Sequence, residues 1–259
     1  MDKKLSFTKA RGFFVTGTDT GVGKTVVAGA IARCLLASGV RVGVFKPIAT
    51  GCRRRREGLV SIDAEFLAHC SDSPFSLEQI NPIRYAEPLA PSVAAERGNK
   101  QVDFGEMELA YSNVVDGSDI VVVEGIGGVM VPIIGAYLVL DLMVDMALPV
   151  VIVAPSGLGA INHTLLTVRA CRERGLEVLG VVLNKYRPEE ASLAEEANPR
   201  VIAELGRVKI LSLIPYDQST CIEKGRLGGD ITAVVALVDW INLLEQDGKK
   251  SDFRWNAHA

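Results

Sequence analysis

Short apolar runs rich in valine and isoleucine recur along the chain, and segments with helical spacing separate them. The runs are Gly12–Val15, Val40–Phe45, Asp119–Val123, Pro149–Val153, Val178–Leu183 and Val208–Ile214. The helical segments are Thr25–Ala37, Phe104–Val115, Asn162–Arg174 and Glu189–Leu205. The runs lack polar alternation, which is typical of strands buried on both faces of a parallel sheet. Because parallel neighbours need helical crossovers, the pattern predicts a doubly wound, mostly parallel α/β sheet flanked by helices, and it leaves the strand order open.

Length and charge narrow the class of protein. With 259 residues, 48% of them hydrophobic, the chain can bury one large core. We expect a single domain over residues 1–259, with a core at about 12–246 and a loose polar tail at 247–259. The 28 basic and 31 acidic residues give a formal net charge of −3, so no extended basic surface for nucleic acid is expected.

Cysteine usage and hydropathy indicate a cytoplasmic protein. The five cysteines are odd in number and include no Cys-x-x-Cys pair, which fits reduced thiols in a cytosol. No apolar stretch of signal-peptide length follows the lysines near the N-terminus, and the stretch Tyr137–Pro155 is interrupted by Asp141 and Asp145. Neither secretion nor a membrane span is therefore expected.

The strongest local signal is the segment Gly17–Thr25, which reads Gly-Thr-Asp-Thr-Gly-Val-Gly-Lys-Thr between the first apolar run and a helix. This is the setting of a P-loop, whose glycines turn backbone N–H groups toward phosphate oxygens. Its lysine reaches the β and γ phosphates, and its threonine ligates magnesium. A bare glycine-rich turn would explain the glycines but not the Lys-Thr pair. The residues of the loop expected to bind nucleotide are Gly21, Val22, Gly23, Lys24, Thr25 and Val26.

The loop is a variant of the usual pattern, because Thr18 stands at its first glycine position and the glycine is displaced to Gly17. Partition-type and septum-positioning ATPases carry a lysine where this chain has Asp19. An acid cannot supply the positive charge that those proteins use across their dimer interface. The segment instead resembles the loop of the dethiobiotin synthetase family at every fixed position, and the resemblance extends from about Gly12 to Tyr216.

A second motif, Asp119–Gly128, delivers Glu124 at the end of an apolar run and follows it with glycines. Ligands bind at that edge of open α/β sheets, so Glu124 is a candidate for magnesium; the alternative is a surface acid that ends a strand. The family's Glu-Gly-x-Gly-Gly pattern is matched, which implies nucleotide contacts by Glu124, Gly125, Ile126 and Gly127. The resemblance also implies that Asp63, otherwise interpreted as a helix N-cap, completes the magnesium site with Thr25 and Glu124.

The segment Val44–Gly51 ends the second run with Lys46, which by itself would be an exposed lysine before a proline bend. The family has Lys-Pro-x-x-[Ser/Thr]-Gly here, and this implies that Lys46 and Thr50 hold a carbamate formed on the substrate. The expected catalytic residues are Lys46, Lys24 and Thr20, and Gly127 and Gly128 are expected to contact the substrate. The nearby run Arg53–Arg56 is interpreted as a solvated face, and whether it acts as a lid is left open.

Two further segments are expected to bind the substrate carboxylate and the nucleobase. Gly157–Thr164 opens a helix, and the resemblance implies that Asn162 binds the substrate carboxylate across a homodimer interface. The pair Asn184-Lys185 resembles the start of a guanine-reading Asn-Lys-x-Asp motif, but Arg187 replaces its acid, which favours ATP over GTP. The expected nucleobase contacts are Asn184, Lys185, Ile214, Pro215 and Tyr216.

The resemblance implies one reaction. 7,8-Diaminononanoate forms a carbamate with CO2, supplied from bicarbonate, and ATP with Mg²⁺ phosphorylates it to a carbamic-phosphoric anhydride. The second amine then closes the ring, giving dethiobiotin, ADP and phosphate. Two alternatives are weighed against it. An amidoligase of the cobyrinic acid type would need a glutaminase with a nucleophilic cysteine, and a partition-type ATPase switch would bind a partner rather than make a product.

Overall fold

A central sheet of six parallel strands forms the frame of the protein, of which the computed structural model describes residues 5–56 and 58–245. The strands are β1 (Gly12–Gly17), β2 (Val42–Phe45), β7 (Ile120–Gly128), β10 (Val150–Pro155), β11 (Val178–Tyr186) and β12 (Ile210–Pro215). Their order is β12-β11-β10-β1-β7-β2, and every neighbouring pair is parallel. Each predicted run forms one strand, so the predicted fold class is confirmed. The predicted tail at 247–259 lies outside the described residues.

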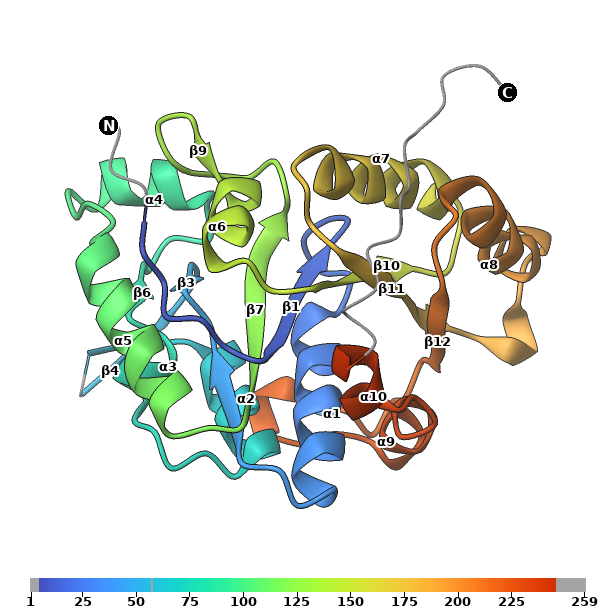
Figure 1. Cartoon of the computed structure of the whole chain (residues 1–259), viewed down its shortest axis with the longest axis horizontal. Helices are drawn as coiled ribbons and strands as arrows, with labels where there is room; N and C mark the ends of the chain where they lie inside the picture. Colours follow the sequence, from blue (N-terminus) through green and yellow to red (C-terminus); the bar gives the residue numbers. More distant parts are fainter. Residues whose placement is uncertain (1–4, 57, 246–259) are drawn as a thin grey trace.

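Helices cover both faces of the sheet (Figure 1). Phe13 and Val15 of β1 enter one core, and Phe14 between them enters the other. Successive side chains of a strand face opposite sides, so two covered faces require an uninterrupted apolar run. The first core includes side chains of α1 (Lys24–Ala37), α2 (Ile62–Ser71), α9 (Gly229–Val235) and α10 (Trp240–Glu245). The second includes side chains of α4 (Pro91–Arg97), α5 (Phe104–Asp116), α6 (Val139–Met146), α7 (Ala160–Glu173) and α8 (Leu193–Gly206).

The four predicted helical segments correspond to α1, α5, α7 and α8, with one division. The segment Glu189–Leu205 splits into the 3-10 turn η1 (Pro188–Glu190) and α8, because Ser192 and Glu195 form a capping box that starts a new helix. The hydropathy pattern did not predict α6, which lies inside the apolar stretch Tyr137–Pro155. Among the residues that the structure describes, no helix is both long and apolar enough to cross a bilayer.

Strand β1 lies between β7 and β10, at the point where the sheet changes its winding direction. The chain passes from β1 through α1 to β2 at one edge, returns to β7 beside β1, and then continues with β10 on the other side. Loops diverge at such a switch point and leave a crevice at the carboxyl edge of the strands. The motifs at the carboxyl ends of β1, β2, β7 and β11 therefore meet at one edge of the sheet.

Three two-stranded sheets lie outside the central sheet. β3 (Ile48–Ala49) pairs with β6 (Ile83–Arg84), β4 (Arg53–Arg55) with β5 (Gly58–Val60), and β8 (Pro132–Ile134) with β9 (Tyr137–Leu138). The side chains of Arg53–Arg56 are exposed, and Arg55 makes a bidentate ion pair with Glu65 of α2. The arginine run is thus an exposed hairpin, in agreement with the solvated-face interpretation.

Candidate active site

The P-loop joins the end of β1 to the first turn of α1. Gly21 and Gly23 have φ angles of 75° and 98°, in the region that favours glycine. A Cβ atom at Gly23 would lie 2.0 Å from Nδ2 of Asn184, so this position has no room for a side chain. The first N–H groups of a helix have no helical partners, and here the first turn of α1 follows directly on the glycine loop. The loop therefore provides an anion site at a helix N-terminus.

Lys24 is the first residue of α1 and its side chain is buried. Its Nζ donates a hydrogen bond to the carbonyl oxygen of Asp19 at 2.8 Å. Burial lowers the pKa of Lys24 to about 8, although the Glu124 carboxylate raises it. A phosphate group beside Nζ would favour the charged form and reverse this shift, which suits Lys24 to an anionic ligand.

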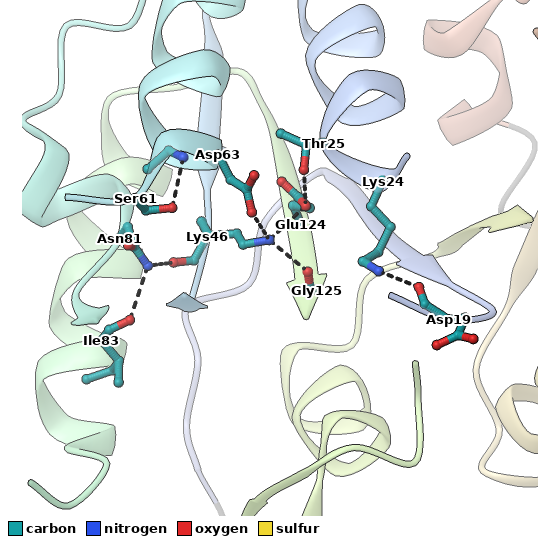
Figure 2. A network of polar contacts seen from close by, with 11 residues as sticks. Asp19, Lys24, Thr25, Lys46, Ser61, Asp63, Asn81, Ile83, Glu124 and Gly125 are labelled. Carbon is teal, nitrogen blue, oxygen red and sulfur yellow. Dashed lines mark hydrogen bonds and ion pairs between the residues drawn. The ribbon is translucent and has the colours of Figure 1, made fainter. Parts of the chain in front are cut away.

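Segments from three parts of the chain converge on the carboxylate of Glu124, as Figure 2 shows. Its Oε1 accepts hydrogen bonds from the Thr25 hydroxyl at 2.8 Å and from Lys46 Nζ at 2.7 Å. Lys46 Nζ also donates to the carbonyl oxygen of Gly125 at 3.1 Å and lies 3.2 Å from Oδ2 of Asp63. The side chains of Lys46 and Glu124 are only 3% and 1% exposed, so the alternatives of an exposed lysine and a surface acid are wrong.

The opposite charges in this cluster stabilise one another in their ionised forms. Burial lowers the pKa of Lys46, but the carboxylates of Glu124 and Asp63 outweigh burial, and the net shift is upward. Burial likewise raises the pKa of Asp63, but Lys46 outweighs it and the net shift is downward. Lys46 is therefore a fixed cation, and Asp63 a fixed anion, at neutral pH.

Asp63 does not cap α2. The cap is Ser61, whose Oγ accepts a hydrogen bond from the N–H of Ala64 at 3.3 Å. Asp63 lies in the first turn instead, and its carboxylate faces Lys46. The N-cap interpretation of Asp63 is wrong for this reason, and the carboxylate is available to the site.

The donor set of Thr25, Glu124 and Asp63 fits a magnesium ion. All three present oxygen atoms to the same cluster, and Oε2 of Glu124 is buried without a hydrogen-bond partner. Mg²⁺ prefers oxygen ligands and combines one or two carboxylates with phosphate oxygens and waters. Within residues 5–56 and 58–245 no cluster of three or more His, Cys, Asp or Glu side chains could hold a metal ion.

A cavity of about 540 Å³ opens along this edge of the sheet. The predicted site residues that line it are Thr20, Gly21, Gly23, Lys24, Thr25, Val26, Lys46, Thr50, Asp63, Glu124, Ile126, Gly127, Asn184, Lys185, Pro215 and Tyr216. Five predicted residues do not line it, namely Val22, Gly125, Gly128, Asn162 and Ile214. Of these, Val22 and Ile214 belong to the core behind the cavity.

Residues of β11 and β12 form another part of the cavity wall. Asn184 Nδ2 donates to the carbonyl oxygen of Val22 at 2.9 Å, and Lys185 Nζ donates to that of Gly21 at 2.7 Å. The guanidinium of Arg187 lies 3.7 Å from the centre of the Tyr216 ring. The residue that replaces the acid of the guanine motif therefore stacks on a wall of the cavity.

Asn162 lies away from this cavity in a single chain. It is exposed near the start of α7 and lines a separate hollow of about 400 Å³ with Leu166, Arg172 and Gly206. A role for Asn162 in the same reaction would therefore have to involve another copy of the chain.

The sequence did not predict two parts of the site. The turn after β12 contributes Asp217, Thr220, Cys221, Ile222 and Glu223 to the cavity wall, and no motif marks it. Asn81, which no sequence motif marks either, donates a hydrogen bond to the carbonyl oxygen of Lys46. A buried asparagine that binds a distant carbonyl leaves no periodic signal in a sequence.

These parts together define a P-loop nucleoside-triphosphate site, and the comparisons place it in a class. A family model described as an AAA domain matches residues 11–223. The septum site-determining protein MinD of Pyrococcus horikoshii, solved with Mg-ADP, aligns with a TM-score of 0.55 at 15% identity over 93% of this chain and 96% of its own. MinD of Aquifex aeolicus aligns with a TM-score of 0.57 at 12% identity over 95% and 100%. At such identities these structures share the fold alone.

Sequence relatives are more specific. The ATP-dependent dethiobiotin synthetase of Thermodesulfovibrio yellowstonii is 38% identical over 239 residues, which cover 87% of this chain and 99% of the relative. That of Bacillus velezensis is 41% identical over 205 residues, 79% and 86% of the two chains. The chain belongs to the dethiobiotin synthetase family, and the resemblance inferred from its motifs is confirmed. The septum-positioning ATPases share its fold but match its sequence far less closely.

Proposed function

We propose that the protein makes dethiobiotin from 7,8-diaminononanoate, CO2 and ATP, through a carbamate and a carbamic-phosphoric anhydride. The observation that carries the proposal is the buried Lys46 ammonium, which lies at the carboxyl edge of the sheet in the same cavity as the P-loop. A lysine at this place adds a second cation beside Lys24, in the space where an anionic substrate would meet the γ phosphate.

The P-loop residues position the triphosphate. The N–H groups of Gly21–Val26 and the ammonium of Lys24 bind phosphate oxygens, and the positive end of α1 adds to their field. Thr25, Asp63 and Glu124 would hold Mg²⁺, which, when bound, neutralises charge on the β and γ phosphates. Because phosphoryl transfer needs little covalent chemistry from a protein, placement and charge are what the loop has to provide.

Lys46 stabilises the substrate anion. A carbamate carries a negative charge, which a buried ammonium favours more strongly than an exposed one because the surroundings are less polar. The carbamate oxygen attacks the γ phosphorus, and the charge that develops on the phosphoryl oxygens is opposed by Lys46 and Lys24. Thr20 and Thr50 line the same cavity and offer hydroxyl groups to the carbamate. The free amine then attacks the carbamate carbon, and phosphate leaves as the ring closes.

Asn184 supports a preference for adenine. Its Nδ2 donates to Val22, which turns the amide oxygen away from that carbonyl. An amide oxygen accepts a hydrogen bond from the 6-amino group of adenine but repels O6 of guanine, and Arg187 cannot replace the missing acid. ATP is therefore the expected triphosphate.

A homodimer, with the active sites at the subunit interface, is part of the proposal. Asn162 lies apart from the Lys46 cavity, which is consistent with a role in the site of a second copy. Sedimentation equilibrium tests this point, because a monomer at assay concentrations would leave the substrate carboxylate without Asn162. A cytoplasmic location stays a prediction.

The direct test is mass spectrometry of the products after incubation with 7,8-diaminononanoate, bicarbonate, ATP and magnesium. We expect dethiobiotin, with one phosphate released per molecule formed. ATP hydrolysis that does not depend on the diamine would instead support a partition-type switch on the same fold.

A further inference from the structure

The backbone of Lys46 depends on contacts from outside its own strand. β2 ends at Phe45, so the sheet no longer supplies partners for the next peptide. The N–H of Lys46 donates to the carbonyl oxygen of Ile80 at 2.7 Å. Its carbonyl oxygen accepts a hydrogen bond from Nδ2 of Asn81 at 2.7 Å, as Figure 2 shows. Both polar groups of the Lys46 backbone are thus held by one short segment.

Asn81 is itself rigidly placed. It is fully buried at the C-terminal end of α3 (Leu77–Ile80), and its N–H donates to the carbonyl oxygen of Leu77 at 2.9 Å. Its Nδ2 also donates to the carbonyl oxygen of Ile83 at 3.3 Å. With both amide hydrogens used, the side chain cannot rotate without losing a bond.

The Lys46 carbonyl oxygen depends on this contact. Within residues 5–56 and 58–245, Asn81 is the one recorded donor to the Lys46 carbonyl oxygen. Pro47 follows and confines Lys46 to extended conformations, but it has no N–H to offer. Without Asn81 the buried oxygen would lose its partner, or the peptide plane would turn toward another one. A shift of this peptide would also move the Cα of Lys46, and with it the side chain that carries the ammonium to Glu124 and Asp63.

The other half of the Asn81 amide argues against a role in packing alone. Its Oδ1 is buried and has no hydrogen-bond partner. A buried acceptor without a donor opposes folding, and an apolar side chain of similar size would avoid that cost. The contact that this side chain does provide is the one to the Lys46 backbone.

We propose that Asn81 is a positioning residue for the reaction, acting through Lys46 by fixing the peptide plane from which the lysine reaches the carbamate. This inference rests on the proposed function. A displacement of about 1 Å at a reacting group costs on the order of 100-fold in rate, so Asn81→Ala should lower kcat roughly 10- to 100-fold. The Kd of Mg-ATP should change by less than about threefold, because the P-loop is held by other contacts.

The experiment compares Asn81→Ala with the wild type and with Ile202→Ala, which truncates a buried side chain of α8 away from the cavity. Tm, the Kd of Mg-ATP and kcat for dethiobiotin formation are measured for each. The ammonium group of Lys46 is also followed by 15N NMR without substrates, because this signal reports its ion pairs whatever the reaction is. Asn81→Asp, which keeps the size but removes the donors, serves if the alanine variant does not fold.

The expected result is a loss of kcat and a shifted or broadened Lys46 signal in the Asn81 variants. The Ile202 variant should keep the wild-type kcat and the wild-type Lys46 signal, although its Tm is lower. If the Asn81 variants keep wild-type kcat, or lose it only in proportion to Tm as Ile202→Ala does, the inference is overturned. A wild-type protein that forms no dethiobiotin refutes the proposed function instead, and an unchanged Lys46 signal then also refutes the positioning role.

Discussion

Thr25 and Lys46 donate hydrogen bonds to the same oxygen atom, Oε1 of Glu124, at 2.8 and 2.7 Å. Thr25 belongs to the P-loop, and Lys46 directly follows β2. One buried carboxylate therefore connects the part of the site that would bind phosphate with the part that would bind the carbamate. A change on either side therefore alters the charge that the other side experiences.

Lys46→Ala should abolish dethiobiotin formation while Mg-ATP still binds. The substitution also leaves Glu124 buried without its cation, and breaking such a pair costs about 3 kcal/mol of unfolding free energy. Product mass spectrometry, calorimetric titration with Mg-ATP and urea unfolding measure the three effects. Normal turnover in this variant would remove the lysine from the mechanism.

Asp63→Asn should raise the magnesium concentration needed for half-maximal activity about tenfold, because a ligand loses its charge. Magnesium titration of the initial rate measures the effect, and excess magnesium should restore part of the rate. The control is Asp119→Asn, which breaks a surface pair with Arg41 at the opposite edge of the sheet. An equal shift in both variants would show that Asp63 does not act through the metal.

Two glycine substitutions in the P-loop should differ in severity. Both Gly21 and Gly23 have positive φ, so alanine at either position is strained by about 1 kcal/mol. A Cβ at Gly21 meets nothing within 4 Å, whereas at Gly23 it meets Asn184 Nδ2. Gly23→Ala should therefore lose far more ATP affinity than Gly21→Ala, as measured by calorimetry. Equal losses of ATP affinity in the two variants would mean that backbone strain, and not the contact with Asn184, determines the effect.

Lys24→Met should stabilise the ligand-free protein while abolishing ATP binding. Burial lowers the Lys24 pKa from the ordinary 10.5 to about 8, so the folded state binds the proton less tightly than the unfolded chain. The resulting destabilisation of the wild type, about 1–3 kcal/mol, is fully present below pH 8 and disappears as the pH rises toward 10.5. Urea unfolding of both proteins across this pH range should show that the variant's higher free energy of unfolding approaches the wild-type value as pH rises. A constant difference would contradict the role of the charge.

The sequence predicted where the strands lie along the chain better than it predicted the order in which they pair in the sheet. A run such as Val178–Leu183 is apolar on both faces, and the structure buries both. The position of β1 between β7 and β10 depends on crossovers through helices, and no run of residues encodes it. Helix α6 was missed because its apolar residues merge with those of β10 in one stretch.

Site residues were predictable where they belong to a local motif. Lys24 and Thr25 follow β1, and Glu124 lies within β7, each in a recognisable pattern, and all three line the cavity. Asp63 by itself was indistinguishable from a helix cap, because its role depends on Lys46, which lies elsewhere in the chain. Asn81 gave no signal at all, since it acts through one hydrogen bond to a backbone oxygen 35 positions away.

The hydrogen bonds from Asn184 and Lys185 to Val22 and Gly21 tie the end of β11 to the phosphate loop through contacts within the protein itself. In many sites the ligand must draw such segments together and lose part of its binding free energy in ordering them. Here that conformational entropy is spent during folding, so the loop is preorganised. The affinity for ATP should then be limited by electrostatics and desolvation rather than by loop closure, and stiffening this loop further should bring little gain.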